Sequence, residues 1–460
     1  MKLHELSLIE LIDFIEKKKI SSSEVNNYFS KRIERYNKKL NVYLTVPDET
    51  HQSSKEGALK GVGLAFKDNI STKDIRTTAS SKVLDNYIPP YNATIVEKIL
   101  ASGGAILGKT NMDAWAHGSS TETSDYGTTR NPYDLDRVPG GSSGGSAVAV
   151  ASGLVPAAIG TETAESIRQP AAWSGVVGLK PSYGRVSRYG IIAMGSSWDC
   201  PGPMTHTVED AAFLLEILAG QDPYDATSSP TPIDSYRNNL SEKKKLTIGY
   251  SLEYFKDVDQ EIRNAVMNTI DLLKKNGHSV KEISLMNPKY AVSVYMILQR
   301  SEVSSNLSRY DGIRFGNPRS YFASEAKRRI MLGTYALSHG YYDQFYKKAE
   351  KVRGMIVDDF NKVFEQVDVI IAPTTPIPAM KIGESEKYPF YGEIMDILGE
   401  PVSAAGIPAL SIPCGLTTTG LPIGVQIMGK YLDESTVLNV GYELEKEVPF
   451  SWKDILKKYE

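Results

Sequence analysis

The chain has 460 residues, with 52 Lys and Arg against 55 Asp and Glu, so its formal net charge at pH 7 is −3. Direct binding of nucleic acid through bulk charge requires a clear excess of basic residues, so this balance excludes that class of protein. A hydrophobic content of 41%, with 37 Gly and 24 Pro, also excludes disordered, collagen-like and coiled-coil chains.

Two helices are predicted within the first 40 residues. Apolar residues recur at helical spacing from Leu6 to Ile15. Ser21 followed by Glu24 is typical of a helix N-cap, and we expect the second helix to continue from there to about Tyr36.

Short apolar runs alternate with helical patterns in the next part of the chain, up to about residue 222. The predicted elements are strands at residues 63–66 and 105–108 and helices at residues 94–102, 148–158 and 207–219. Thr207 is the expected cap of the last of these helices. Such alternation predicts an α/β architecture with a largely buried sheet.

The second half of the chain begins with a candidate linker, residues 227–245, which is rich in Ser, Pro, Asn and charge. The elements predicted after it are strands at residues 246–250, 280–285, 367–373, 408–413 and 424–428, a helix ending at residue 275, two helices within residues 327–364, and a helix at residues 433–446.

Because the chain returns to strands near its end, we predict one interleaved domain over residues 1–460. Its parts are N-terminal helices (1–45), a core (60–225), a peripheral segment (246–366) and a C-terminal return to the sheet (367–460).

Residues 103–110 match the pattern GxxxxGK[ST] of a phosphate-binding loop. That loop needs a strand before its first glycine and a helix after its lysine. Here the residues before Gly103 have a helical pattern, and residues 105–107 have the pattern of a strand. We therefore interpret the match as a helix–strand connection and expect no cofactor.

Residues 138–147 (VPGGSSGGSA) are rich in Gly and Ser and lead directly into small helix-forming residues. A flexible linker has a similar composition, but a linker would not be followed at once by a helix. Free N–H groups at the start of a helix stabilise negative charge or orient a hydroxyl.

Two further segments accompany this loop. Residues 63–69 (GLAFKDN) place Lys67 at the end of an apolar strand, and residues 159–172 (IGTETAESIRQPAA) place Ser166 within a turn-rich segment. The three segments together resemble the amidase signature family. Lys67 and Ser142 are 75 positions apart, and Ser142 and Ser166 are 24 apart, which agrees with the family's Lys–Ser–Ser triad.

The resemblance covers nearly the whole chain, and it is strongest with the amidotransferase branch of that family, whose members release ammonia for tRNA-dependent amidation. The segments that carry it are MD (112–113), GSSTE (118–122), TRNP (129–132), GLKPSYGRVSRYG (178–190), SSNLSRYDG (304–312), KRRIMLGT (327–334) and GLPIGVQ (420–426). It implies the amidase-signature fold, an α/β fold with a mixed central sheet flanked by helices on both faces.

The resemblance assigns Ser166 as nucleophile, Ser142 as the bridging serine and Lys67 as the base, and it implies a cis peptide bond before Ser142. A lysine must be neutral to accept a proton, so we expect burial or nearby positive charge to lower the pKa of Lys67. The six histidines lack metal-ligand spacing, and we expect no metal site.

The resemblance also implies an oxyanion hole formed by backbone N–H groups of Thr163, Ala164, Glu165 and Ser166. The family's usual pattern there is T-D-T-G-G-S, whereas residues 161–166 of this chain are T-E-T-A-E-S. Side chains replace both glycines, and a carboxylate beside the nucleophile opposes an oxyanion unless it points away or is protonated. We therefore predict weakened or substrate-restricted catalysis.

The resemblance also implies a donor site, meaning a binding site for the glutamine that donates the ammonia. It consists of Arg329 and Asp396, with Tyr295 as a weaker candidate for the same pocket. An arginine suits a bidentate grip on the α-carboxylate of glutamine, and an aspartate suits its α-ammonium. A solvated helix face is the alternative interpretation of Arg329, because Lys327 and Arg328 precede it.

The leading hypothesis is a glutaminase that supplies ammonia to amidotransferase partner subunits, which would hold the tRNA and use ATP. A stand-alone amidase for small aliphatic or aryl amides and a catalytically weak scaffold are the alternatives. No apolar run is long enough to span a bilayer, no signal-peptide core begins the chain, and two cysteines cannot form a disulfide framework. We therefore expect a cytoplasmic protein that binds neither membrane nor nucleic acid directly.

Overall fold

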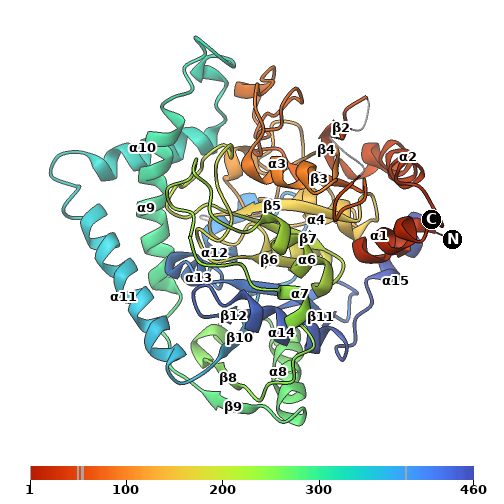
Figure 1. Cartoon of the computed structure of the whole chain (residues 1–460). Coiled ribbons are helices and arrows are strands. Elements are labelled where there is room, and N and C mark those ends of the chain that lie inside the picture. Colours follow the sequence, from red (N-terminus) through yellow and green to blue (C-terminus); the bar gives the residue numbers. More distant parts are fainter. Residues whose placement is uncertain (1, 49–50, 53–55, 389–390) are drawn as a thin grey trace.

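The computed structural model describes residues 2–48, 51–52, 56–388 and 391–460, and Figure 1 shows a β-sheet through its middle with helices packed around it. The α-helices are α1 (Leu8–Glu16), α2 (Ser22–Leu40), α3 (Thr94–Ala101), α4 (Gly144–Ala151), α5 (Arg168–Ser174), α6 (Val208–Leu218), α7 (Tyr236–Asn239), α8 (Gln260–Lys275), α9 (Lys289–Leu307), α10 (Ser324–Leu337), α11 (Tyr346–Phe364), α12 (Tyr391–Met395), α13 (Glu400–Ala405), α14 (Glu434–Glu445) and α15 (Lys453–Leu456).

The strands come from both halves of the chain. They are β1 (Tyr43–Thr45), β2 (His51–Gln52), β3 (Gly63–Lys67), β4 (Ala105–Thr110), β5 (Ala157–Glu162), β6 (Val177–Lys180), β7 (Cys200–Thr205), β8 (Thr247–Tyr250), β9 (Ser279–Glu282), β10 (Val369–Pro373), β11 (Ala409–Leu416) and β12 (Pro422–Gly429).

These strands form one sheet in the order β1-β4-β3-β5-β7-β6-β11-β12-β10-β8-β9, with β2 paired to β4. The pairs β3–β4 and β3–β5 are parallel, whereas the pairs from β5 through β7, β6, β11 and β12 to β10 are antiparallel. The sheet is therefore mixed, and the predicted α/β fold is confirmed. Its β6–β11 pair brings the segment before β11 next to the central part of the chain.

The second N-terminal helix begins where its capping signal predicts, and the first begins at a capping box that was not predicted. Ser7 and Ser21 each accept a hydrogen bond from the backbone N–H three residues later, and Glu10 and Glu24 complete the two capping boxes. The second helix ends at Leu40, one turn beyond the predicted end.

The helix predicted at residues 148–158 is wrong at its C-terminal end. It stops at Ala151, and Gly153 has a φ of 63°, a left-handed conformation that glycine adopts readily. Ala157 already belongs to β5. Small apolar residues suit a helix and a buried strand equally well, so local pattern could not separate the two elements.

The candidate linker at 227–245 is also corrected, because it contains the short helix α7. Tyr236 is completely buried, and Asn439 of α14 donates hydrogen bonds to the carbonyls of Asn239 and Leu240. The match to a phosphate-binding loop is a helix–strand connection, as interpreted, since residues 105–110 form the buried strand β4.

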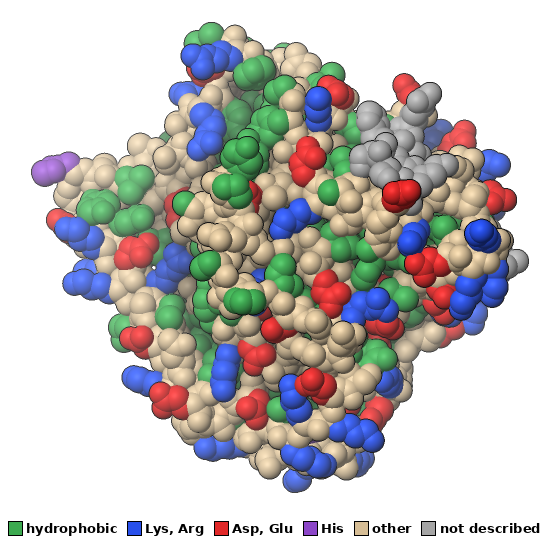
Figure 2. Space-filling view, in the orientation of Figure 1, with side chains coloured by type: hydrophobic (Ala, Val, Ile, Leu, Met, Phe, Trp, Pro, Cys, Tyr) green, Lys and Arg blue, Asp and Glu red, His purple; other side chains and the backbone are tan. Residues whose placement is uncertain are grey.

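Figure 1 shows the two ends of the chain side by side. An ion pair joins them, with Lys2 Nζ 2.5 Å from Glu460 Oε1. On the face seen in Figure 2, basic and acidic side chains are interspersed without a field of one sign. Within the described ranges, no helix is both long and apolar enough to cross a membrane. The single-domain organisation remains a prediction.

Candidate active site

Lys67 ends β3, whose side chains are all buried because the strand lies inside the sheet between β4 and β5. Its Nζ donates hydrogen bonds to Ser142 Oγ at 2.7 Å and to the carbonyl of Thr161 at 2.9 Å. The lysine is completely buried. The structure thus joins Lys67 to Ser142, as the resemblance implies.

The loop before α4 holds Ser142 in place, and its Gly141–Ser142 peptide bond is cis, as expected. A side chain at Gly141 would not fit, because its Cβ would lie 2.0 Å from Asp113 Oδ2. The Gly141 N–H donates to Gln169 Oε1 at 2.8 Å. Glycine at this position therefore permits a close approach of the loop to a buried carboxylate.

Ser166 lies beside this loop, because its carbonyl accepts the N–H of Ser143 at 3.1 Å. It sits in the turn between β5 and α5, and Glu162 Oε2 fixes that turn by accepting the N–H groups of Ile167 and Arg168 at 3.0 and 3.2 Å. Ser166 is 3% exposed. The three predicted catalytic residues therefore lie in one buried region.

The electrostatics of the site suit a lysine that acts as a base. Burial lowers the pKa of Lys67 to about 7, although the negative charges of Asp113, Asp199 and Glu162 act in the opposite direction. This shift brings the neutral form of Lys67 within reach near pH 7.

Four consecutive N–H groups, from Thr163 to Ser166, are available to an oxyanion. Among the described residues, none of these four donates a hydrogen bond to a protein acceptor. The loop is held instead through other atoms. Thr163 Oγ1 donates to Asp199 Oδ1 at 2.7 Å, and the carbonyl of Ala164 accepts from Ser403 Oγ at 2.6 Å. Such preorganised donors are what an oxyanion hole requires.

The substitutions at Ala164 and Glu165 do not strain the loop, because neither residue has a positive φ. The Glu165 side chain is buried and packs against Gly399. Burial raises the pKa of the Glu165 carboxyl well above its usual value, which favours its neutral form. The predicted repulsion of an oxyanion is therefore reduced, and weakened or substrate-restricted catalysis remains a prediction.

The three predicted donor residues occupy one buried region next to this loop. Arg329 Nη1 donates to Gln299 Oε1 at 3.2 Å, and Asp396 Oδ2 accepts from Ser119 Oγ at 2.8 Å. Tyr295 is buried edge-on against Trp198, and the charges of Arg329 and Asp396 both act on its hydroxyl. Arg329 is only 4% exposed, which excludes the solvated helix face.

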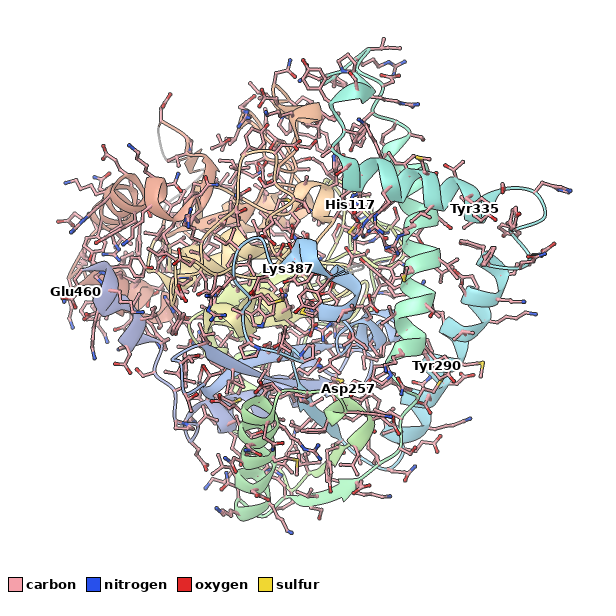
Figure 3. All side chains as sticks on the ribbon, turned by 180° about the vertical axis from the view of Figure 1, so that it is seen from behind. His117, Asp257, Tyr290, Tyr335, Lys387 and Glu460 are labelled. Carbon is pink, nitrogen blue, oxygen red and sulfur yellow. The ribbon has the colours of Figure 1, made fainter. Side chains whose placement is uncertain are left out.

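A cavity of about 540 Å³ opens beside this region. Its wall includes His117, Ser119, Arg329, Tyr391 and Gly392. Figure 3 shows His117 next to α9 and α10, the helices that carry Tyr295 and Arg329. The lining of the cavity therefore includes Arg329, one of the three predicted donor residues, and Ser119, which donates a hydrogen bond to Asp396.

Several residues that support the site were not predicted. Arg168 forms a buried ion pair with Glu162, with Nη2 and Oε1 2.6 Å apart, and Asp113 accepts the N–H groups of Ser120 and Thr121. Gln169 bonds the loop at Gly141. Asp113, Arg168 and Gln169 all lie in motif segments, but a motif does not indicate which of its side chains bind the backbone and which face a substrate.

Known proteins share both the sequence and the fold that carry this geometry. Residues 24–438 match the family model described as Amidase. The chain is 48% identical over 474 residues to the A subunit of glutamyl-tRNA(Gln) amidotransferase from Halothermothrix orenii, and the match covers 98% of this chain and 99% of the relative.

Solved structures agree with this result. The crystal structure of the A subunit of glutamyl-tRNA(Gln) amidotransferase from Thermotoga maritima superposes with a TM-score of 0.86 at 38% identity and covers 98% of this chain and 96% of its own. A bacterial aryl acylamidase of the amidase signature family superposes with a TM-score of 0.86 at 25% identity, and 99% of each chain is covered.

Proposed function

The chain belongs to the amidase signature family, and from this premise we propose that it hydrolyses the side-chain amide of glutamine and supplies the ammonia to partner subunits of a tRNA-dependent amidotransferase. One observation carries the hydrolysis: the buried Lys67–Ser142 hydrogen bond lies beside Ser166 and a loop of available N–H groups.

In the proposed mechanism, neutral Lys67 accepts a proton from Ser142 while Ser142 accepts the proton of Ser166. Ser166 Oγ then attacks the amide carbon, and the negative oxygen is stabilised by the N–H groups of residues 163–166. The proton returns through Ser142 to the amide nitrogen. The C–N bond breaks, ammonia leaves, and an acyl-enzyme remains on Ser166. Water hydrolyses that ester by the same proton route and yields a carboxylate and the free serine.

The pH dependence of this reaction follows from Lys67. Only neutral Lys67 can accept a proton, and the pKa of its ammonium is about 7, so kcat/KM should rise with pH and level off above about pH 8. The measurement is kcat/KM between about pH 5.5 and 8.5 on a neutral amide such as pentanamide, which does not itself titrate. A profile that is flat or that falls with pH would contradict Lys67 as the base.

Glutamine fits the region beyond Ser166 through its two charged groups. Asp396 would take the α-ammonium, and Arg329 would take the α-carboxylate. Support comes from the burial of both side chains beside one cavity and from the similarity to the A subunits of amidotransferases. The two free, buried cysteines suit the reducing cytoplasm that we propose as its location.

The decisive experiment assays the purified chain, alone and with co-expressed partner subunits, on glutamine and on simple aliphatic and aryl amides. We expect glutamine to be the preferred substrate and the partner subunits to raise its turnover. A preference for simple amides without any partner would reject the glutaminase role. It would favour the second candidate, a stand-alone amidase, for which the similarity to an aryl acylamidase is the supporting observation.

A further inference from the structure

We propose that Glu165 is a specificity-determining residue of the donor site and that, together with Asp396 and Glu400, it selects amides that carry an ammonium group. This inference rests on the proposed function in one respect, which is that the ligand is an amide bound next to Ser166. It concerns a position at which this chain departs from the T-D-T-G-G-S pattern.

The position of Glu165 is that of a binding residue. It directly precedes Ser166 and is completely buried, and neither of its carboxyl oxygens has a hydrogen-bond partner among the described residues. A buried carboxyl group without such a partner is costly, so an N–H donor from a ligand would stabilise it.

Arg168, the arginine beside Glu165, does not donate a hydrogen bond to its carboxyl group. Arg168 Nη1 lies 4.0 Å from Glu165 Oε1, beyond hydrogen-bond distance. The Arg168 guanidinium is already engaged elsewhere, because it donates to Glu162 at 2.6 and 2.9 Å and to Gln426 at 2.6 Å. Glu165 therefore retains the capacity to accept hydrogen bonds from a ligand.

The chain makes room for this side chain at Gly399. A Cβ at Gly399 would lie 2.4 Å from Glu165 Cδ, so no larger residue could stand there without displacing the glutamate. Gly399 lies between Asp396 and Glu400, so Glu165 packs against the segment that carries both of these carboxyl groups. The negative charges of Asp396 and Glu400 are among the causes that raise the pKa of Glu165.

The charges of this region accommodate a cationic ligand. Its buried carboxyl groups are Glu162, Glu165, Asp396 and Glu400, and its buried guanidinium groups are Arg168, Arg300 and Arg329. Arg329 also donates a hydrogen bond to Glu325 at 2.6 Å. Glu325 is partly exposed and accepts a second hydrogen bond from Arg328. His117 adds no positive charge, because burial lowers its pKa well below its usual value. Without a ligand, the neutral form of Glu165 leaves three carboxyl groups (Glu162, Asp396 and Glu400) opposite three guanidinium groups. An ammonium group that binds beside Glu165 would favour its ionised form and so preserve this balance.

The test compares two amides of equal length, 4-aminobutanamide, which carries an ammonium group, and pentanamide, which carries a methyl group in its place. Binding to the full-length Ser166→Ala variant is measured by calorimetry, so that turnover does not interfere. We expect 4-aminobutanamide to bind at least about tenfold more tightly, and the additional change Glu165→Gln to reduce this ratio about tenfold, as for the loss of a hydrogen bond to a charged group.

Glu445→Gln provides the matched control, because Glu445 is a partly buried carboxyl group of α14 that accepts the Val208 N–H. This change should leave the binding ratio of the two amides unchanged. Glu400→Gln is a second variant of the same pocket and should also lower the ratio. A ratio near one with Ser166→Ala, or a ratio that neither pocket variant changes, would overturn the inference. If the native chain hydrolyses no amide while the ratio depends on Glu165, the proposed function fails and this inference stands.

Discussion

Replacing Ser166 by alanine should lower kcat/KM for amide hydrolysis on the order of a millionfold, since the nucleophile that forms the acyl-enzyme is lost. Replacing Lys67 by methionine should lower it by roughly a hundred- to ten-thousandfold, the range for loss of a general base. Both effects follow from the 2.7 Å contact between Lys67 Nζ and Ser142 Oγ beside Ser166. Steady-state kinetics on glutamine, and covalent labelling with a fluorophosphonate, measure them.

The controls for these variants are buried residues of the same types outside the site. Ser174 ends α5 and donates to the carbonyl of Pro139, and Lys180 in β6 donates to the carbonyl of Ile407 at 2.8 Å. Ser174→Ala and folded Lys180→Met should keep the activity and the label on Ser166. If Ser166→Ala retained the native rate, or if the label attached to another serine, the assignment of the nucleophile would be wrong. Absence of both activity and label in the native chain would favour the weak scaffold.

Replacing Arg168 by methionine should lower the free energy of unfolding by about 3–5 kcal/mol, the usual effect of removing one partner of a buried ion pair. Arg168 and Glu162 are both completely buried, and the change would leave Glu162 without its countercharge. It would also remove the hydrogen bonds that Arg168 donates to the carbonyls of Ala164 and Gly399. Urea unfolding at pH 7 measures the loss.

An exposed arginine provides the comparison. Arg130 donates to the carbonyl of Leu135 at the surface, and Arg130→Ala should change the stability by less than about 1 kcal/mol. The double variant Glu162→Gln with Arg168→Met should be less destabilised than the sum of the two single changes, because neither charge is then left alone. A loss below about 1 kcal/mol for Arg168→Met would mean that the pair does not hold the loop.

Much of the fold could be predicted because its signals are local. Three examples are the apolar spacing of α1 with the capping serine of α2, the apolar runs of β3 and β4, and the period of α14, all of which depend only on neighbouring residues. Prediction failed where a local pattern fits two structures. The apolar segment that ends α4 and begins β5 is one case, and the polar segment that folds into α7 against α14 is the other.

The donor region shows the same division. The motif segments identify Arg329, Asp396 and Tyr295 as candidates, but their residue types do not reveal that Arg329 is buried. Gly399 and Glu400 carry no motif at all. Their place beside the site is visible only in the tertiary structure, where the β6–β11 pair brings the segment before β11 against the loop of Glu165.

By itself, the amino-acid sequence determined the family, the α/β class and the identities and spacing of Lys67, Ser142 and Ser166, because these depend on short motifs and local periodicity. Only the tertiary structure decided the protonation and surroundings of the site. The lowered pKa of Lys67 and the raised pKa of Glu165 both arise from burial among groups distant in the sequence. The near-neutral charge of the whole chain likewise gave no sign that four buried carboxyl groups and three buried guanidinium groups gather around its donor site, since net charge sums over all residues and does not show where they lie.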